Sequence, residues 1–398
     1  MKICCADKLE KLPPYIFSRI NKLKLEAYAK NLDVIDLVMG NPDIPVSKKI
    51  IDRLCDTVIN HPKTHRYPQA KGMPKFRKTV ADWFYRRFGV KLDPETEVLA
   101  LVGSKEGVGH LCMAILNPND LAIIPDPGYP VYYNGVILAN GRVYQMPILE
   151  QNEYLPELEK IPTKILREAK IMFLNYPNNT TGAVIKDISF FKEVIKFAKK
   201  YNIIIVHDNA YSELTFDGYT APSFLEIEGA KDVGVEFHSF SKTYSMAGWR
   251  IGFVVGNRDI IRYLEKFKSF IDYGVATFIQ LAAVVALTES DDYVKEMRKI
   301  YQERRDKFIK ELYKIGWQIE KPLGTMYLWA KLPEKFRKVG SLEFCVSLLN
   351  ETGVAISPGS GFGKYGEGYV RMALVTHINR FHDAALRFKK FFQKTIDA

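Results

Sequence analysis

Short apolar runs alternate with amphipathic stretches along most of the chain. The apolar runs, such as VLALVG and NIIIVHD, are nearly continuous, which is typical of strands that helices cover on both faces. The stretches between them repeat apolar positions at every third or fourth residue, as surface helices do. Strands are therefore predicted at 98–103, 121–126, 141–148, 170–177, 202–208, 235–240 and 250–256, and helices at 48–59, 73–88, 105–116, 189–201 and 259–270.

This alternation predicts an α/β fold with a mostly parallel central sheet flanked by helices. The two ends of the chain follow a different pattern. A helix is predicted at 16–30 and a long one at 291–315, and TMYLWAKLP and YVRMALV are predicted strands of a smaller α+β domain. We predict a large domain at 46–290, a small domain at 291–398, and an amino-terminal arm at 1–45 that forms part of the small domain.

The composition is that of a globular protein with a large core: 398 residues, 47% of them hydrophobic and 26% charged. The net charge of +11 raises the question of a nucleic-acid partner. However, the basic residues are mixed with acidic ones along helical faces, as in YVKEMRKIYQERRDKF, and no nucleic-acid-binding motif is present. We therefore expect no nucleic-acid partner, and a positive field that attracts anionic substrates and a phosphorylated cofactor.

Targeting and metal signals are weak. The amino-terminal sequence has no continuous apolar segment of the kind found in signal peptides, and no apolar run approaches the roughly 20 residues that cross a bilayer. The five cysteines, with Cys4 and Cys5 adjacent, show neither metal-ligand spacing nor a disulfide framework. We expect a cytoplasmic protein without membrane association and without a metal site.

The segment SFSKTYSMAGWRIGF carries the strongest chemical signal. Lys242 lies in it between a predicted strand and a glycine turn, with Ser239 three residues before it and Arg250 eight residues after it. An amine held in a pocket can condense with an aldehyde, and pyridoxal phosphate (PLP) enzymes need such a lysine beside donors for the phosphate. A lone Lys–Arg pair is usually a solvated surface pair, so the prediction depends on further residues.

Two further candidates follow the strand NIIIVHD, at the position where open α/β sheets bind ligands. The carboxylate of Asp208 could pair with a pyridinium nitrogen and keep it protonated, which makes the ring an electron sink. The hydroxyl of Tyr211 could bond to the phenolate oxygen of the same ring. Taken alone, Asp208 could equally be the N-cap of a following helix.

GSKEG, at 103–107, joins a predicted strand to a predicted helix. The glycine permits a tight turn, and the free N–H groups of Ser104 and Lys105 at the helix start would attract an anion. The alternative is a plain capped helix, and the spacing does not fit a P-loop.

Three other motifs place polar or aromatic groups where a ligand could meet them. Tyr129 in PDPGYP could stack on a flat cofactor, and Asn179 in NYPNNTTG could reach a ring oxygen. Arg371 interrupts the apolar strand GYVRMAL, so it needs a buried partner. A substrate carboxylate would suit its guanidinium, and an internal salt bridge is the alternative.

Taken together, these motifs resemble the class I/II aminotransferases, which are PLP enzymes of fold type I. The resemblance covers nearly the whole chain. Within the class, LPPYIF, MGNPD, HRYP and GSKEG together resemble most closely the branch of alanine (glutamate–pyruvate) and LL-diaminopimelate aminotransferases. Its anchors are MGNPD, HRYPQAKG, GSKEG, PDPGYP, NNTTG, HDNAYSE, SFSKTYSMAGWRIGF and GYVRMAL.

The resemblance implies a role for each matching residue. Lys242 would form the covalent link to the cofactor and move the proton, while Tyr67 would reach the phosphate of a neighbouring subunit, so that a homodimer shares its active sites. Around the cofactor, Ser104, Lys105, Ser239 and Arg250 would grip the phosphate, Tyr129 would stack on the ring, Asp208 would hold its nitrogen, and Tyr211 and Asn179 would contact its phenolate oxygen. The substrate would be held by Arg371, Gly40 and Asn179, with Tyr15 lining the pocket.

Two positions depart from the family pattern. The usual Asn-Pro-Thr-Gly reads Asn179-Thr180-Thr181-Gly182 here, and the loss of the proline is expected to loosen the turn. Ala70 stands where plant-type diaminopimelate aminotransferases carry a glutamate that grips the distal amine of the substrate.

The second departure favours transamination between alanine or glutamate and pyruvate or 2-oxoglutarate. LL-diaminopimelate remains the alternative amino donor. A PLP-dependent C–S β-lyase and a non-catalytic PLP-binding module are further alternatives.

Overall fold

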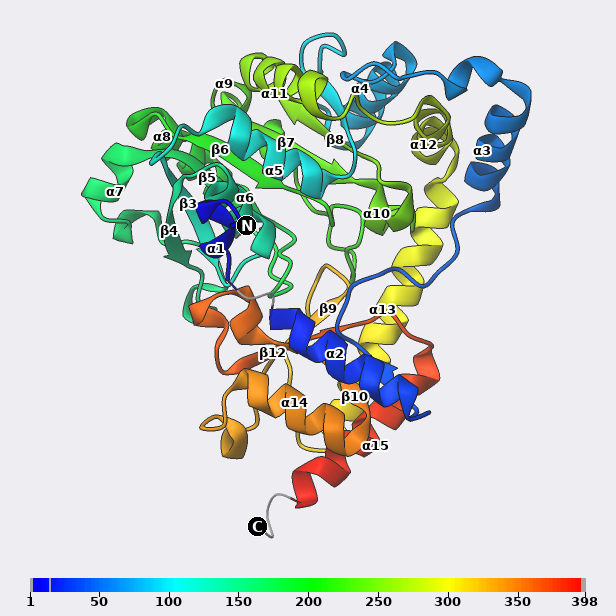
Figure 1. Cartoon of the computed structure of the whole chain (residues 1–398), viewed down its shortest axis with the longest axis vertical. Helices are drawn as coiled ribbons and strands as arrows, with labels where there is room; N and C mark the ends of the chain where they lie inside the picture. Colours follow the sequence, from blue (N-terminus) through cyan, green and yellow to red (C-terminus); the bar gives the residue numbers. More distant parts are fainter. Residues whose placement is uncertain (1–2, 14–15, 395–398) are drawn as a thin grey trace.

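The computed structural model describes residues 3–13 and 16–394, and a seven-stranded sheet forms the centre of its larger part (Figure 1). Every strand of the sheet lies where one is predicted, within a few residues. Only β8 runs opposite to the other six strands, so the sheet is mostly parallel, as predicted. The order is β2 (Val98–Leu101), β8 (Gly252–Gly256), β7 (Gly234–Ser239), β6 (Ile204–Asp208), β5 (Ala169–Asn175), β3 (Leu121–Asp126) and β4 (Arg142–Pro147).

Helices cover both faces of this sheet, which explains the continuous apolar runs. Along β5, Ile171 and Phe173 enter the hydrophobic cluster on one face, and Met172 and Leu174 enter the cluster on the other. The first cluster includes side chains of α5 (Ser104–Ile115), α6 (Pro130–Leu138) and α11 (Arg258–Ile271); the second includes side chains of α4 (Pro74–Phe88), α8 (Ser189–Tyr201) and α12 (Thr277–Glu289).

The smaller part combines both ends of the chain. β1 (Ile35–Asp36) pairs in parallel with β10 (Val354–Ala355), and α2 (Ile16–Ala29) lies beside α14 (Ser341–Thr352) (Figure 1). A three-stranded antiparallel sheet of β11 (Ser357–Pro358), β12 (Tyr369–Ala373) and β9 (Tyr327–Lys331) packs with α13 (Asp291–Lys314) and α15 (Ile378–Lys394) around a hydrophobic cluster of its own. The cluster draws its members from residues 20–38 and from the last hundred residues, among others.

Four helices of nine or more residues are absent from the sequence-based prediction: α6, α12, α14 and α15. The segment TFIQLAAVVALTE of α12 is apolar on nearly all sides and therefore shows no helical periodicity. α3 (Lys48–Asn60), α13 and the other predicted helices agree with their predicted ranges within one or two residues.

Three strands differ in detail from the prediction. β2 ends at Leu101, because Gly103 adopts a φ of +84° and turns the chain into α5. β8 begins only at Gly252, because Arg250 adopts a left-handed φ of +54°. β4 is an edge strand and half-buried, not covered on both faces. In the described part of the chain, no helix has the length and apolarity that crossing a membrane requires.

Candidate active site

A cavity of about 730 Å³ lies where one edge of the large sheet meets the smaller part of the molecule. The carboxyl ends of β5, β6 and β7 reach this edge. Because β8 alone is reversed, β2 runs in the same direction as these strands, and α5, which follows β2, begins at the same edge. Because parallel strands end at the same edge, residues far apart in the sequence converge on it. Eleven of the predicted site residues line the cavity: Gly40, Ser104, Lys105, Tyr129, Asn179, Asp208, Tyr211, Ser239, Lys242, Arg250 and Arg371.

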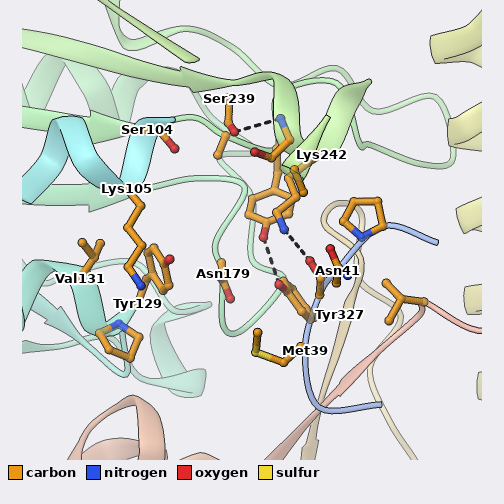
Figure 2. A pocket seen from close by; sticks show the side chains of 18 of the residues that line it. Met39, Asn41, Ser104, Lys105, Tyr129, Val131, Asn179, Ser239, Lys242 and Tyr327 are labelled. Carbon is orange, nitrogen blue, oxygen red and sulfur yellow. Dashed lines mark hydrogen bonds between the residues drawn. The ribbon is translucent and has the colours of Figure 1, made fainter. Parts of the chain in front are cut away.

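Lys242 projects into the middle of this cavity from the short helix α10 (Phe240–Thr243) (Figure 2). The side chain of Ser239 caps this helix and accepts a hydrogen bond from Ser241 N at 3.2 Å. Lys242 Nζ donates to the carbonyl oxygen of Gly40 at 2.5 Å. Burial lowers the pKa of Lys242, which increases the fraction of neutral, nucleophilic amine.

Asp208 lies at the end of β6 and is buried. Its Oδ2 accepts a hydrogen bond from Tyr132 Oη at 2.8 Å, whereas Oδ1 has no hydrogen-bond partner among the residues that the structure describes. Burial raises the pKa of Asp208. A cation placed against Oδ1 would stabilise the ionised carboxylate, so this position fits a protonated ring nitrogen. Tyr132 is a site residue that the sequence did not reveal.

Tyr327 is a second residue without a sequence signal, because it lies in an ordinary apolar strand. Its hydroxyl accepts a hydrogen bond from Tyr211 Oη at 3.2 Å (Figure 2). Although burial opposes its ionisation, the nearby cations Arg371 and Lys242 lower the pKa of Tyr327. A Cβ at Gly40 would lie 2.0 Å from Tyr327 Oη, so only glycine allows the chain to pass at this point.

Arg371 is 6% exposed, and among the described residues no carboxylate pairs with it, so the alternative of an internal salt bridge is wrong. Its Nη1 donates to Asn179 Oδ1 at 2.7 Å and its Nη2 to Val38 O at 3.0 Å, while Nε has no partner in the described chain. The guanidinium carbon lies 4.0 Å from the ring centroid of Tyr327. A buried cation without an anion fits a substrate carboxylate.

The start of α5 also lines the cavity. Gly103 turns the chain into α5, whose first residues, Ser104 and Lys105, line the cavity. The first N–H groups of a helix have no partner within it and attract anions. Arg250 Nη2 lies 3.5 Å from Val102 O, and a Cβ at Gly103 would come within 2.4 Å of that Nη2. A helix start beside a guanidinium fits a phosphate.

Two predicted site residues lie elsewhere. Tyr67 is 90% exposed and is not part of the cavity of its own chain. Tyr15 lies outside the described residues. Tyr129 lines the cavity, and its ring meets that of Tyr132 edge-on at 5.9 Å.

The turn that carries Asn179 is not loosened by the loss of the family's proline. The side-chain oxygen of Asn178 accepts hydrogen bonds from Thr180 N at 2.8 Å, from Thr181 N at 2.9 Å and from the Thr181 hydroxyl at 2.9 Å. Asn179 N in turn donates to Asn175 Oδ1 at 2.8 Å. Asn178 therefore restrains the turn by hydrogen bonds where a proline would restrain it by its ring.

Comparisons with known proteins agree with this geometry. The family model "Aminotransferase class I and II" matches residues 32–381. The chain is 46% identical over 389 residues to the LL-diaminopimelate aminotransferase of Moorella thermoacetica, covering 98% of both chains, and 49% identical over 385 residues to that of Syntrophobacter fumaroxidans, covering 97% and 98%. Substrate-bound BacF from Bacillus subtilis superposes with a TM-score of 0.93 at 40% identity, covering 98% of both chains.

These matches extend over nearly the whole chain. They agree with a cavity that offers an amine, a carboxylate oxygen and a guanidinium, the last two without a charged partner among the residues that the structure describes. Members of the family use pyridoxal 5′-phosphate, and the donor set of the cavity fits that group. The chain therefore belongs to the class I and II aminotransferases of fold type I.

Proposed function

We propose that the protein transfers an amino group from LL-diaminopimelate to a 2-oxo acid such as 2-oxoglutarate. The observation that carries this proposal is the identity of 46% and 49%, over nearly the full length, to proteins named LL-diaminopimelate aminotransferases. These relatives favour diaminopimelate over the alanine–glutamate reaction that we expected first. The argument from Ala70 concerns only the plant-type enzymes, and another residue would hold the distal amine here.

In this proposal each residue of the cavity has a separate role in the reaction. PLP, when bound, supplies an electron sink for the pair of electrons released at the substrate Cα. Lys242 Nζ removes the Cα proton and later returns a proton, because its lowered pKa leaves part of the amine neutral. Asp208 keeps a positive charge on the ring nitrogen, and Arg371 with Asn179 Oδ1 beside it orients the α-carboxylate.

The proposed enzyme is a homodimer in which each cavity is completed by the partner. Tyr67 supports this proposal because its ring is 90% exposed on its own chain and packs only 5.7 Å from Tyr273, which is itself 60% exposed. Phe270 and Ile271 beside it are also exposed, at 81% and 59%. Such a group of apolar side chains is typical of a protein–protein interface.

A screen of amino donors tests the proposal. We expect the PLP-loaded protein to convert LL-diaminopimelate with 2-oxoglutarate at a kcat/KM at least roughly tenfold above that for alanine, glutamate or aspartate. A higher kcat/KM for alanine would instead support the first expectation. Release of pyruvate and ammonia from cystathionine without an oxo acid would identify a C–S β-lyase and overturn the proposal.

A further inference from the structure

Lys268 on α11 is a buried charge that lies outside the cavity. Its side chain is 0% exposed, and its Nζ donates to Glu106 Oε1 at 2.8 Å and to Asp272 Oδ2 at 2.7 Å. An ammonium group loses its hydration on burial and is tolerated only when partners replace the water. The two carboxylates therefore fix this ammonium in one place.

Glu106 connects Lys268 to the start of α5. Its second oxygen, Oε2, accepts a hydrogen bond from Val102 N at 2.9 Å, and its Oε1 lies 2.5 Å from His110 Nδ1. Although burial alone would raise the pKa of Glu106, the neighbouring His110 and Lys268 hold it below its ordinary value. Glu106 thus remains a carboxylate and holds the backbone of residues 102–105, which we call the phosphate turn.

The phosphate turn is sensitive to small shifts. Val102 O faces Arg250 Nη2 at 3.5 Å, and a Cβ at Gly103 would approach the same nitrogen to 2.4 Å. A displacement of Glu106 would move the N–H groups of Ser104 and Lys105 relative to Arg250. The donors for one phosphate would then no longer converge.

Asp272 connects the same lysine to a second segment. Its Oδ1 accepts a hydrogen bond from Gly274 N at 2.7 Å. Gly274, at a φ of +91°, packs against the loop of Tyr67, since an added Cβ would lie 2.7 Å from Gln69 O. The ring of Tyr273 lies 5.7 Å from that of Tyr67. One ammonium therefore links the phosphate turn to the loop that is proposed to reach a partner's phosphate.

The same group of side chains could be taken for a metal site, because Glu106, His110 and Asp272 place three ligand atoms within 4.8 Å of one another. However, Lys268 Nζ already bonds to two of the three. The ammonium supplies the positive charge that a metal ion would bring, so the cluster is better described as a buried lysine bound by two carboxylates.

We propose that Lys268 is a positioning residue for the coenzyme phosphate, acting through Glu106 on the phosphate turn. This inference rests on the proposed function only in requiring that PLP binds at Lys242. It predicts that removal of the Lys268 charge weakens binding of the phosphate group specifically and leaves the ring contacts of Asp208 and Tyr211 in place.

Coenzyme-free Lys268→Met is titrated with PLP and with pyridoxal, which lacks the phosphate, and covalent attachment is followed by mass after borohydride reduction. We expect the affinity for PLP to fall roughly 10- to 100-fold, the range seen when groups that orient ligands are removed, and the affinity for pyridoxal to stay at the wild-type value. Lys266→Met, an exposed lysine on the same helix, is the matched control and should bind both as the wild type does.

An equal loss for PLP and pyridoxal would show that Lys268 only stabilises the fold, and no loss for either would show that the phosphate turn stands without it; both results overturn the inference. If Lys268→Met is not recovered folded, Glu106→Gln takes its place under the same criteria. A wild-type protein that binds no PLP would instead refute the proposed function, so the two failures are distinguishable.

Discussion

Two buried polar atoms in the cavity, Asp208 Oδ1 and Arg371 Nε, have no hydrogen-bond partner in the described chain. Native proteins seldom leave such groups unsatisfied, so unpaired atoms in a cavity indicate where a ligand supplies the partner. The carboxylate oxygen of Asp208 is positioned to bind a cation, and the guanidinium of Arg371 is positioned to bind an anion. Lys242, which has a lowered pKa, lies in the same cavity.

For single residues, we expect Lys242→Ala to lower kcat by roughly 10⁴-fold or more, because both the covalent link and the proton transfer at Cα depend on the nitrogen of Lys242. The measurement is kcat with the proposed substrates, together with the mass of the protein after incubation with PLP and borohydride. Lys266→Ala serves as the control. Near-normal turnover or an unchanged PLP adduct in Lys242→Ala would contradict the assignment.

Tyr132→Phe removes the side-chain donor from Asp208 Oδ2 and leaves a buried carboxylate less satisfied. We expect the free energy of unfolding of the coenzyme-free protein to fall by about 1–3 kcal/mol, the cost of an unmet buried acceptor. Urea unfolding measures it, and Tyr133→Phe next to it, on a less buried side chain, should change the value little. Equal stability of the two variants would mean that Asp208 finds another donor.

Among the structural elements, the common edge of β5, β6 and β7 explains why the site forms where it does. Asn175 pairs with Asp208 across β5 and β6, and Asn175 Nδ2 donates to Asp208 O at 2.7 Å. The strand ends thus bind one another before any ligand arrives. This preorganisation is what electrostatic catalysis requires, since the groups need not move during the reaction.

The carboxyl end of β3 makes a contact of a different kind. Asp126 is buried, and its two oxygens accept hydrogen bonds from Lys364 N and Tyr365 N, both at 3.1 Å. These residues belong to the glycine-rich run 357–368, which begins with β11 and continues as two short 3-10 helices before β12. The contact ties the large sheet to the smaller part of the molecule.

Burial raises the pKa of Asp126 from its ordinary 3.8 to about 6. The folded protein therefore holds this proton more tightly than the unfolded chain, and the contribution is fully present below pH 3.8 and is lost as the pH rises through about 6. We expect Asp126→Asn to remove this part of the pH dependence, about 3 kcal/mol for two pKa units.

Urea unfolding of both proteins at pH 4 and pH 7 measures the difference. The wild type should lose more stability than Asp126→Asn between these values. Parallel pH profiles would show that Asp126 titrates near its ordinary pKa.

For the molecule as a whole, the site exists only because the two parts meet. Gly40 and Arg371 come from the smaller part, and Lys242 and Asp208 come from the larger one. In the smaller part, Arg304 Nη1 and Nη2 donate hydrogen bonds to the two carboxylate oxygens of Asp43, at 2.7 and 2.8 Å. The hydrophobic cluster of the smaller part also takes in Tyr211, Leu214 and Phe216 from the predicted large domain, and the domain boundaries stay a prediction.

The proposed homodimer leads to a complementation experiment. If Tyr67 serves the partner's cavity, inactive Lys242→Ala chains and weakly active Tyr67→Ala chains should form hybrid dimers with one intact site. After mixing and re-equilibration we expect activity to recover to about a quarter of the wild type, because half of the dimers are hybrids. Activity that stays at the mean of the two unmixed variants would mean that Tyr67 acts within its own chain or not at all.

The sequence alone determined where the seven strands of the large sheet lie along the chain, because burial on both faces leaves a local, continuous apolar pattern, and it also located several of the helices between them. It also identified the lysine, carboxylate and arginine of the site, because charged residues at strand ends or inside apolar strands stand out from their neighbours. The tertiary structure decided the rest: Tyr132 on Asp208, Tyr327 beside Gly40, Arg371 with its Nε unpartnered in the described chain, and Lys268 between Glu106 and Asp272. Three of these contacts, Tyr132–Asp208, Glu106–Lys268 and Gly40–Tyr327, join residues 76 to 287 positions apart, and the others depend on what surrounds a side chain on all sides. No local periodicity records either kind of information.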